Sequence, residues 1–107
     1  MDRTLIIGNL TRDPECSVTS NGTAVCNFTV AVNKRVRAGE AQQTKFVRVT
    51  AWREMAQNCG NYLAKGKKVA VWGTMDAHGY LDQHGQVAVS MEMTADEVEF
   101  LTPRSAE

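Results

Sequence analysis

The chain has 107 residues, of which 43% are hydrophobic, and this length fits a single domain over residues 1–107 rather than two domains. No apolar run approaches the roughly 20 residues needed to span a bilayer, and the N-terminus lacks the apolar stretch of a signal peptide, so we expect a cytoplasmic protein without a membrane partner. The formal net charge is zero, so attraction for a polyanion would require an uneven distribution of charge.

Alternation of apolar and polar residues predicts three strands in the first half of the chain, at about residues 4–10, 23–33 and 45–52. In a strand, successive side chains point to opposite faces, so one set of each strand faces the core. The expected inward residues of the second and third strands are Ala24, Cys26, Phe28, Val30, Val32, Val47, Val49 and Ala51. The outward set of the third strand is then Phe46, Arg48, Thr50 and Trp52.

A helix and two further strands are expected in the second half. Apolar residues at helical spacing predict a helix between Arg53 and Lys65, with Gly66 as the residue that ends it. Strands follow at 68–80 and 86–95, with a short extension near 98–101. Their expected inward residues are Val69, Val71, Gly73, Met75, Ala77, Val87, Val89, Met91 and Met93. This order predicts an all-β OB-fold, a five-stranded Greek-key barrel with one helix between strands 3 and 4.

Basic and acidic residues are segregated along the chain. Residues 34–68 carry nine basic and two acidic side chains, whereas residues 69–107 carry one basic and seven acidic side chains. This asymmetry predicts a local positive field if the fold keeps the two segments apart, and a cancelled field if the fold interleaves them. The basic side chains, candidate contacts to a phosphate backbone, are Lys34, Arg35, Arg37, Lys45, Arg48, Arg53, Lys65, Lys67 and Lys68.

Two aromatic rings flank an arginine on the outward face of the third predicted strand. Leaving Phe46 and Trp52 exposed costs about 1.5–3 kcal/mol each, which a soluble domain tolerates mainly where a ligand covers the rings. Unpaired bases stack on such rings with about 1–3 kcal/mol per contact, and Arg48 is suited to hold a phosphate or to stack on a base. This face is therefore a candidate site for a single-stranded nucleic acid.

The outward face of the fourth predicted strand carries Trp72, Thr74, Asp76, His78 and Tyr80. Aromatic residues are also enriched at protein interfaces, so a subunit interface is at least as good an interpretation for Trp72 as a nucleic-acid contact. For Phe46 and Trp52, which flank Arg48, we favour base stacking over an interface.

The sequence indicates neither an enzyme nor a metal or cofactor site. Cys16, Cys26 and Cys59 are odd in number and widely spaced, so we expect three reduced thiols that pack as small hydrophobes. His78 and His84 lack a neighbouring cluster that would complete a metal site, so surface histidines are expected. A Gly-rich phosphate loop and a nucleophile elbow are also missing from the sequence.

Four segments that together cover nearly the whole chain share a family pattern: residues 5–15 (LIIGNLTRDPE), 21–33 (NGTAVCNFTVAVN), 46–53 (FVRVTAWR) and 61–66 (NYLAKG). In sequence and in order, these segments resemble the bacterial single-stranded DNA-binding proteins (SSB). The resemblance implies an OB-fold, a homotetramer built as a dimer of dimers, and sequence-tolerant wrapping of single-stranded DNA in replication, recombination and repair. By the same resemblance, the base-stacking aromatics are Phe46, Trp52 and Tyr80, and the backbone-contacting cations include Arg3, Arg48 and Lys65.

The chain departs from the family pattern in two respects. Val36 stands where the family often has another stacking aromatic, and Asp76 and His78 lie on a strand that often carries arginine, so fewer contacts or a shifted DNA path are expected. The sequence ends at Glu107 without the Gly/Pro/Gln-rich tail and acidic tip of cellular members. Residues 102–107 are expected to form a short C-terminal extension. Either a tail was removed from a longer protein, or this is a short form such as those of phages and mobile elements, so the sequence does not support recruitment of partner proteins through a tail.

Two alternative interpretations stay open. A primosomal relative, a dimeric OB-fold that acts in replication restart, would share the length and the fold. A protein-interaction OB-domain without nucleic-acid function would agree with the zero net charge and the acid on the fourth strand. Native mass spectrometry distinguishes a dimer from a tetramer, and a salt titration identifies binding through phosphates.

Overall fold

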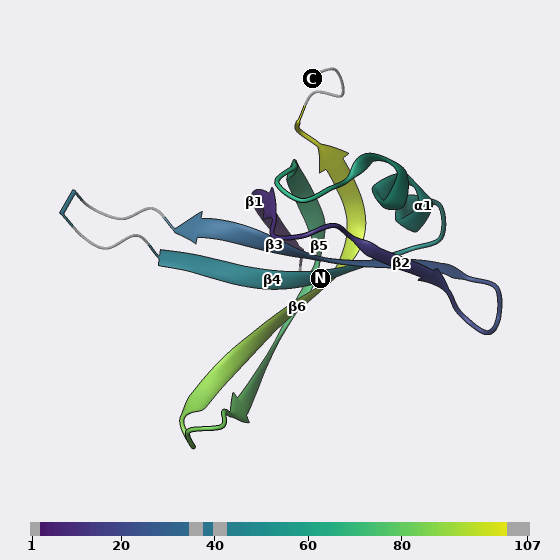
Figure 1. Cartoon of the computed structure of the whole chain (residues 1–107). Coiled ribbons are helices and arrows are strands. Elements are labelled where there is room, and N and C mark those ends of the chain that lie inside the picture. Colours follow the sequence, from purple (N-terminus) through teal and green to yellow (C-terminus); the bar gives the residue numbers. More distant parts are fainter. Residues whose placement is uncertain (1–2, 35–37, 40–42, 103–107) are drawn as a thin grey trace.

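The computed structural model describes residues 3–34, 38–39 and 43–102 (Figure 1). The elements in chain order are β1 (Thr4–Leu10), β2 (Glu15–Val18), β3 (Ala24–Lys34), β4 (Gln43–Trp52), α1 (Arg53–Tyr62), β5 (Lys68–Leu81) and β6 (Val87–Phe100). The predominance of strands and the position of α1 between β4 and β5 confirm the predicted fold class. No helix among these residues is long and apolar enough to cross a membrane.

Five of the strands close into a barrel. The sheet order is β1-β5-β6-β4-β3-β2, and an additional pairing of β1 with β3 joins the first five into a ring. Neighbouring strands are antiparallel, except that β4 and β6 run parallel. This ring is the predicted OB-fold barrel, and β2 lies outside it as an edge strand along β3.

Two glycines allow the backbones of neighbouring strands to approach closely. A Cβ at Gly8 would lie 2.2 Å from the carbonyl oxygen of Ala31, and a Cβ at Gly73 would lie 2.0 Å from the carbonyl oxygen of Thr94. Gly8 precedes Asn9, which pairs with Ala31 where β1 meets β3 and the ring closes. A larger residue at Gly8 would therefore collide with the backbone at the closure point.

The hydrophobic core fills the ring. Ala56 and Cys59 of α1 are buried, and the helix packs against β3 and β4 at one end of the barrel (Figure 1). Burial raises the pKa of the Cys59 thiol to about 11, which keeps this group neutral among apolar neighbours. The other buried members of the core are Ile6, Leu10, Cys26, Phe28, Val30, Val47, Val49, Ala51, Leu63, Val69, Val71, Met93 and Ala95.

The observed elements differ from the predicted ones in three places. The sequence does not predict β2, because all four of its residues are exposed and show no alternation of burial. The helix α1 ends at Tyr62 rather than Lys65, because Leu63 already has extended backbone angles, and Gly66 (φ 89°) lies in the following turn. The strand β6 continues to Phe100, because it pairs with β5 on both sides of a bulge at Asp96.

The far half of the β5–β6 hairpin extends away from the barrel (Figure 1). Its strands remain paired as far as Leu81 and Val87, but the barrel interior ends before them. Ala77 is exposed, and Val87 and Val89 are 78% and 62% exposed. The prediction that Ala77, Val87 and Val89 belong to the core is therefore wrong. Alternation identifies the face of a strand that a residue occupies, but it does not tell whether another element covers that face.

The expectation of three reduced cysteines is wrong for two of them. Cys16 on β2 and Cys26 on β3 lie directly opposite each other, with their Cα atoms 4.0 Å apart, and form a disulfide. Cys59 is free and buried. Because the β2–β3 ladder is what brings the first two residues together, the pairing follows from a strand that the sequence pattern does not reveal.

Candidate nucleic-acid interface

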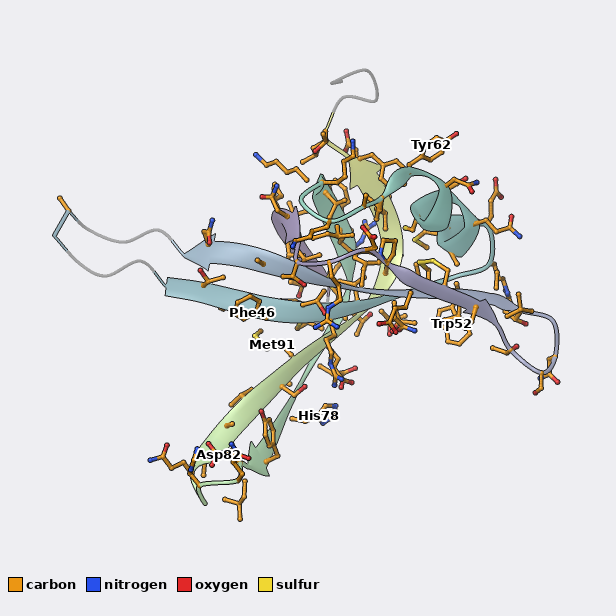
Figure 2. The ribbon with its side chains drawn as sticks, viewed as in Figure 1. Phe46, Trp52, Tyr62, His78, Asp82 and Met91 are labelled. Carbon is orange, nitrogen blue, oxygen red and sulfur yellow. A yellow bond between two sulfur atoms is a disulfide. The ribbon has the colours of Figure 1, made fainter. Side chains whose placement is uncertain are left out.

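The outward side chains of β4 form the surface that we call the β4 face, made of Phe46, Arg48, Thr50 and Trp52. Between them, Val47, Val49 and Ala51 are buried in the core, so the strand alternation holds along this stretch. Phe46 is 59% exposed and Trp52 is 41% exposed. Figure 2 shows the two rings well separated along β4, and six residues of extended strand correspond to about 20 Å.

A groove of about 520 Å³ lies next to Arg48 on the outside of the sheet. Residues of β3 and β4 line it together with the segment that leads into β2 and one residue of β6. Thr50 Oγ1 donates a hydrogen bond of 2.8 Å to Asn27 Oδ1 and so ties β4 to β3 within the groove. The residues that line it are Arg12, Asp13, Glu15, Asn27, Phe28, Thr29, Arg48, Thr50 and Glu92. The lining is polar and carries both positive and negative side chains.

Strand pairing brings four outward residues into one row across the sheet. Thr29 lies opposite Arg48, Arg48 lies beside Glu92 in the parallel β4–β6 pair, and Glu92 lies opposite Asp76. Arg48 Nη2 donates to Glu92 Oε1 and, at 3.2 Å, to Ser90 Oγ. The Arg48 guanidinium is therefore already bound by β6, although its side chain remains 64% exposed.

Trp52 borders a second hollow, of about 560 Å³, where β4 passes into α1. Thr19, Asn21 and Thr23 from the β2–β3 turn line it together with Trp52 and Arg53. Arg53 has a φ of 62°, in the left-handed region, at the point where the chain changes direction from strand to helix. Arg53 is exposed and lines the same hollow as Trp52.

Three of the predicted cations lie where α1 leads into β5: Lys65 and Lys67 in the connecting turn, and Lys68 at the start of β5. Asp13 Oδ1 accepts a hydrogen bond of 2.8 Å from the backbone N–H of Lys65, which ties this turn to the wall of the groove. Lys65 and Lys68 are exposed, and Lys67 is half-buried. The backbone of this turn therefore lies against Asp13, on one side of the groove.

The remaining predicted cations are dispersed. Arg3 forms an ion pair with Glu97 of β6, with an N···O distance of 3.7 Å. Lys45 is exposed and adjacent to Phe46 in β4. The side chain of Lys34 and residues 35–37, which are Arg35, Val36 and Arg37, lie outside the described residues. Two ion pairs thus join basic side chains to the acidic strand β6, so the fold partly interleaves the opposite charges.

The third predicted stacking residue, Tyr80, lies on the far half of the β5–β6 hairpin and is 51% exposed. Asp76 and His78 share its outward alternation along β5, and both are exposed. His78 lies opposite Ser90, and Figure 2 shows it on the part of the hairpin that leads away from β4. Tyr80 therefore belongs to the same side of β5 as the charged row, but lies farther from the barrel.

Trp72 belongs to a different surface, which we call the β1–β5 patch and which consists of Leu5, Ile7 and Trp72. Leu5 lies opposite Trp72 in the β1–β5 ladder, and Ile7 follows on the same side of β1. Leu5 is 48% exposed and Ile7 is 46% exposed, whereas Trp72 is half-buried. This patch exposes branched aliphatic side chains where the β4 face exposes rings.

Sequence reasoning assigned no functional role to six residues that line the groove: Arg12, Asp13, Glu15, Asn27, Thr29 and Glu92. The alternation of β3 already places Asn27 and Thr29 outward, so that part of the groove could have been anticipated. Glu92 could not, because it reaches Arg48 across 44 residues of sequence through the parallel β4–β6 pairing.

Comparison with known proteins relates the chain to one family. The Single-strand binding protein family matches residues 1–101. The chain is 37% identical to the "Single-stranded DNA-binding protein" of Halalkalibacterium halodurans, over 100% of this chain and 64% of that protein. It is 38% identical to the "Single-stranded DNA-binding protein 2" of Clostridium acetobutylicum, over 94% of this chain and 77% of that protein. It is 37% identical to the "Single-stranded DNA-binding protein A" of Bacillus subtilis, over 98% of this chain and 62% of that protein. The chain thus spans between 62% and 77% of the length of these relatives.

Proposed function

This chain belongs to the single-strand binding protein family, and from that premise we propose that it binds single-stranded DNA without sequence preference. The observation that carries the proposal is the exposure of Phe46 and Trp52 on either side of Arg48. Every base has a flat π-face, so stacking on exposed rings tolerates any sequence. Covering each ring with a base also removes apolar surface from water.

The proposed path of the strand follows the β4 face. A strand along β4 meets Trp52, then the groove beside Arg48, and then Phe46. From the Phe46 end, Tyr80 continues the path onto the hairpin, because β6 runs parallel to β4. Stacking on the three rings holds the bases, while cations around the path contact the phosphates. The cations proposed to contact the backbone are Arg3, Lys34, Arg35, Arg37, Lys45, Arg48, Arg53, Lys65, Lys67 and Lys68.

The proposed biological role is to coat and protect DNA strands that replication, recombination and repair leave unpaired in the cytoplasm. Stacking and ion pairing make and break no covalent bond, so the proposal assigns no catalytic residue and no metal or cofactor. Bound proteins keep bases from pairing because the stacked bases face aromatic side chains instead of a complementary strand.

The proposal includes a homo-oligomer, a tetramer built as a dimer of dimers, with the β1–β5 patch as a subunit contact. Burying Leu5, Ile7 and Trp72 against a second copy would remove apolar surface that a single chain leaves in water. Native mass spectrometry without DNA tests this part. A tetramer supports it, a dimer favours the replication-restart alternative, and a monomer contradicts it.

A fluorescence titration with oligo(dT) of several lengths, at two salt concentrations, tests the binding. The chain has two tryptophans, so Trp72→Phe leaves Trp52 as the only reporter and Trp52→Phe leaves Trp72. We expect DNA to quench the fluorescence of Trp72→Phe strongly and that of Trp52→Phe weakly.

A labelled oligonucleotide measures the affinity of the same variants independently. The Kd of Trp52→Phe should stay within about threefold of the wild-type value, because a phenyl ring still stacks on a base. Saturable binding without quenching of Trp52 would contradict the stacking assignment. Absence of binding at low salt would contradict the function itself.

A further inference from the structure

We infer that Glu92 competes with DNA for Arg48. Its carboxylate holds the guanidinium in the free protein, and a DNA phosphate binds Arg48 only by displacing that carboxylate. The inference rests on the proposed function, because it assigns to the same face a residue that limits its affinity. Glu92 then acts as an internal competitor for the anion that the site binds.

The first observation is the position of the pair. Arg48 and Glu92 lie side by side in the parallel β4–β6 register, and both line the groove. Arg48 Nη2 donates to Glu92 Oε1 and to Ser90 Oγ, so β6 supplies both partners of that nitrogen atom. The Arg48 and Glu92 side chains are 64% and 44% exposed. A phosphate in solution can therefore reach the pair and exchange with the carboxylate.

The second observation is a further carboxylate in the same row. Asp76 lies opposite Glu92 in the antiparallel β5–β6 ladder. Like charges directly opposite each other destabilise such a pair, and the Arg48 cation beside Glu92 offsets their repulsion. When a phosphate takes Arg48, both carboxylates lose that cation and face an additional anion. Displacement therefore costs more than the loss of a single isolated ion pair.

The alternative is that the pair is purely structural and stays closed when DNA binds. In that case Glu92 would influence binding only as one negative charge among several. Charges that act independently at a distance have additive effects on affinity. If a phosphate must displace Glu92 from Arg48, substitutions of these two residues have non-additive effects. A double-mutant cycle on Arg48 and Glu92 therefore separates the two possibilities.

The experiment compares wild type, Glu92→Gln, Arg48→Met and the double variant in titrations with oligo(dT). Glu92→Gln should raise the affinity at low salt at least about twofold, because the loss of an exposed ion pair alone accounts for about two- to fivefold. Its plot of log K against log salt should become steeper by up to about 0.7, the slope for one more phosphate neutralised on a single strand. Arg48→Met should weaken binding at least about twofold more in the Glu92→Gln background than in wild type.

The matched control is Glu99→Gln, which makes the same change of charge on the same strand, opposite Ala70 and outside the groove lining. Glu92→Thr is a second variant, with a residue type that β-strands favour, and thermal melts confirm that each variant folds.

Four outcomes decide the matter. Additive effects of Arg48→Met and Glu92→Gln on the affinity would overturn the proposed competition, and so would an equal gain in affinity from Glu99→Gln. If the wild-type protein binds oligo(dT) but neither Glu92 variant binds it more tightly, the inference about Glu92 is overturned and the proposed function stands. Absence of binding in all variants at low salt overturns the proposed function and the inference with it.

Discussion

The β4 face and the β1–β5 patch both expose large apolar side chains, but their surroundings differ. On the β4 face, two rings stand on either side of an exposed guanidinium and next to a polar groove. On the β1–β5 patch, Leu5 and Ile7 lie beside a half-buried Trp72 on paired strands. Flat rings with a cation suit a flat, anionic ligand, whereas branched aliphatic side chains suit another apolar protein surface. Exposure alone thus does not identify what binds a surface; the neighbouring chemistry does.

The substitution Ile7→Asp should have the largest effect, and it should affect subunit association through the β1–β5 patch without affecting DNA binding on the β4 face. A carboxylate buried in an apolar contact loses its water without gaining a partner, so we expect association of subunits to weaken at least 100-fold, or about 3 kcal/mol. Binding of an oligo(dT) short enough for one subunit should persist. Native mass spectrometry and titration measure the two effects, and Val18→Asp on β2 is the matched control. An oligomer that survives Ile7→Asp would exclude the patch from the interface.

The substitutions Phe46→Ala and Trp52→Ala should each weaken oligo(dT) binding by about 1–3 kcal/mol, because each removes a stacking platform. Both residues lie outside the buried core, so the fold and the oligomeric state should not change. Titration and circular dichroism measure these effects. Leu5→Ala removes apolar surface from the other region and should leave the Kd for a short oligonucleotide unchanged. Wild-type affinity in both aromatic variants would contradict the assignment of DNA binding to the β4 face.

The substitution Tyr80→Ala should have a smaller effect that depends on the length of the DNA. Tyr80 lies on the far half of the hairpin, beyond the charged row, so only a longer strand reaches its ring. We expect a loss of about 1 kcal/mol for long oligonucleotides and no loss for short ones. A series of oligo(dT) lengths measures this difference. An equal loss at every length would mean that the strand begins at the hairpin rather than on β4.

The substitution Lys65→Ala should have the smallest effect on affinity, below about 1 kcal/mol at moderate salt, because an exposed cation contributes little. Its signature is the salt dependence, whose slope should become less steep by about 0.7 if Lys65 neutralises one phosphate. Titrations at several salt concentrations measure the slope. The oligomeric state should not respond, and an unchanged slope would place Lys65 off the DNA path.

The sequence predicts the barrel strands well where one side of a strand is buried. In β3 and β4, Cys26, Phe28, Val47 and Val49 alternate with outward residues, and this pattern alone gives the orientation of the β4 face. The same pattern fails for Val87, because the hairpin continues after the barrel has ended. Period-two alternation carries information about faces, not about what packs on them.

Contacts between distant parts of the chain are what the sequence could not provide. The Arg48–Glu92 pair depends on a parallel register between β4 and β6, which no local pattern encodes. The Cys16–Cys26 disulfide depends on β2, whose exposed residues give no periodic signal. The family resemblance assigned Arg48 a role in DNA binding, but it did not anticipate that a carboxylate already occupies its guanidinium.

Because of the Cys16–Cys26 disulfide, the stability of this protein should depend on the redox state of the medium. The bridge connects residues ten positions apart, and a loop of that length corresponds to about 2–3 kcal/mol of chain entropy removed from the unfolded state. When a thiol reagent opens the bridge, backbone pairing with β3 and packing against α1 still hold β2, whose first residue, Glu15, lines the groove. The reduced protein should therefore melt at a lower temperature than the oxidised protein, and its β2 should be less restrained beside the groove. Affinities for DNA should be compared only between preparations in the same redox state.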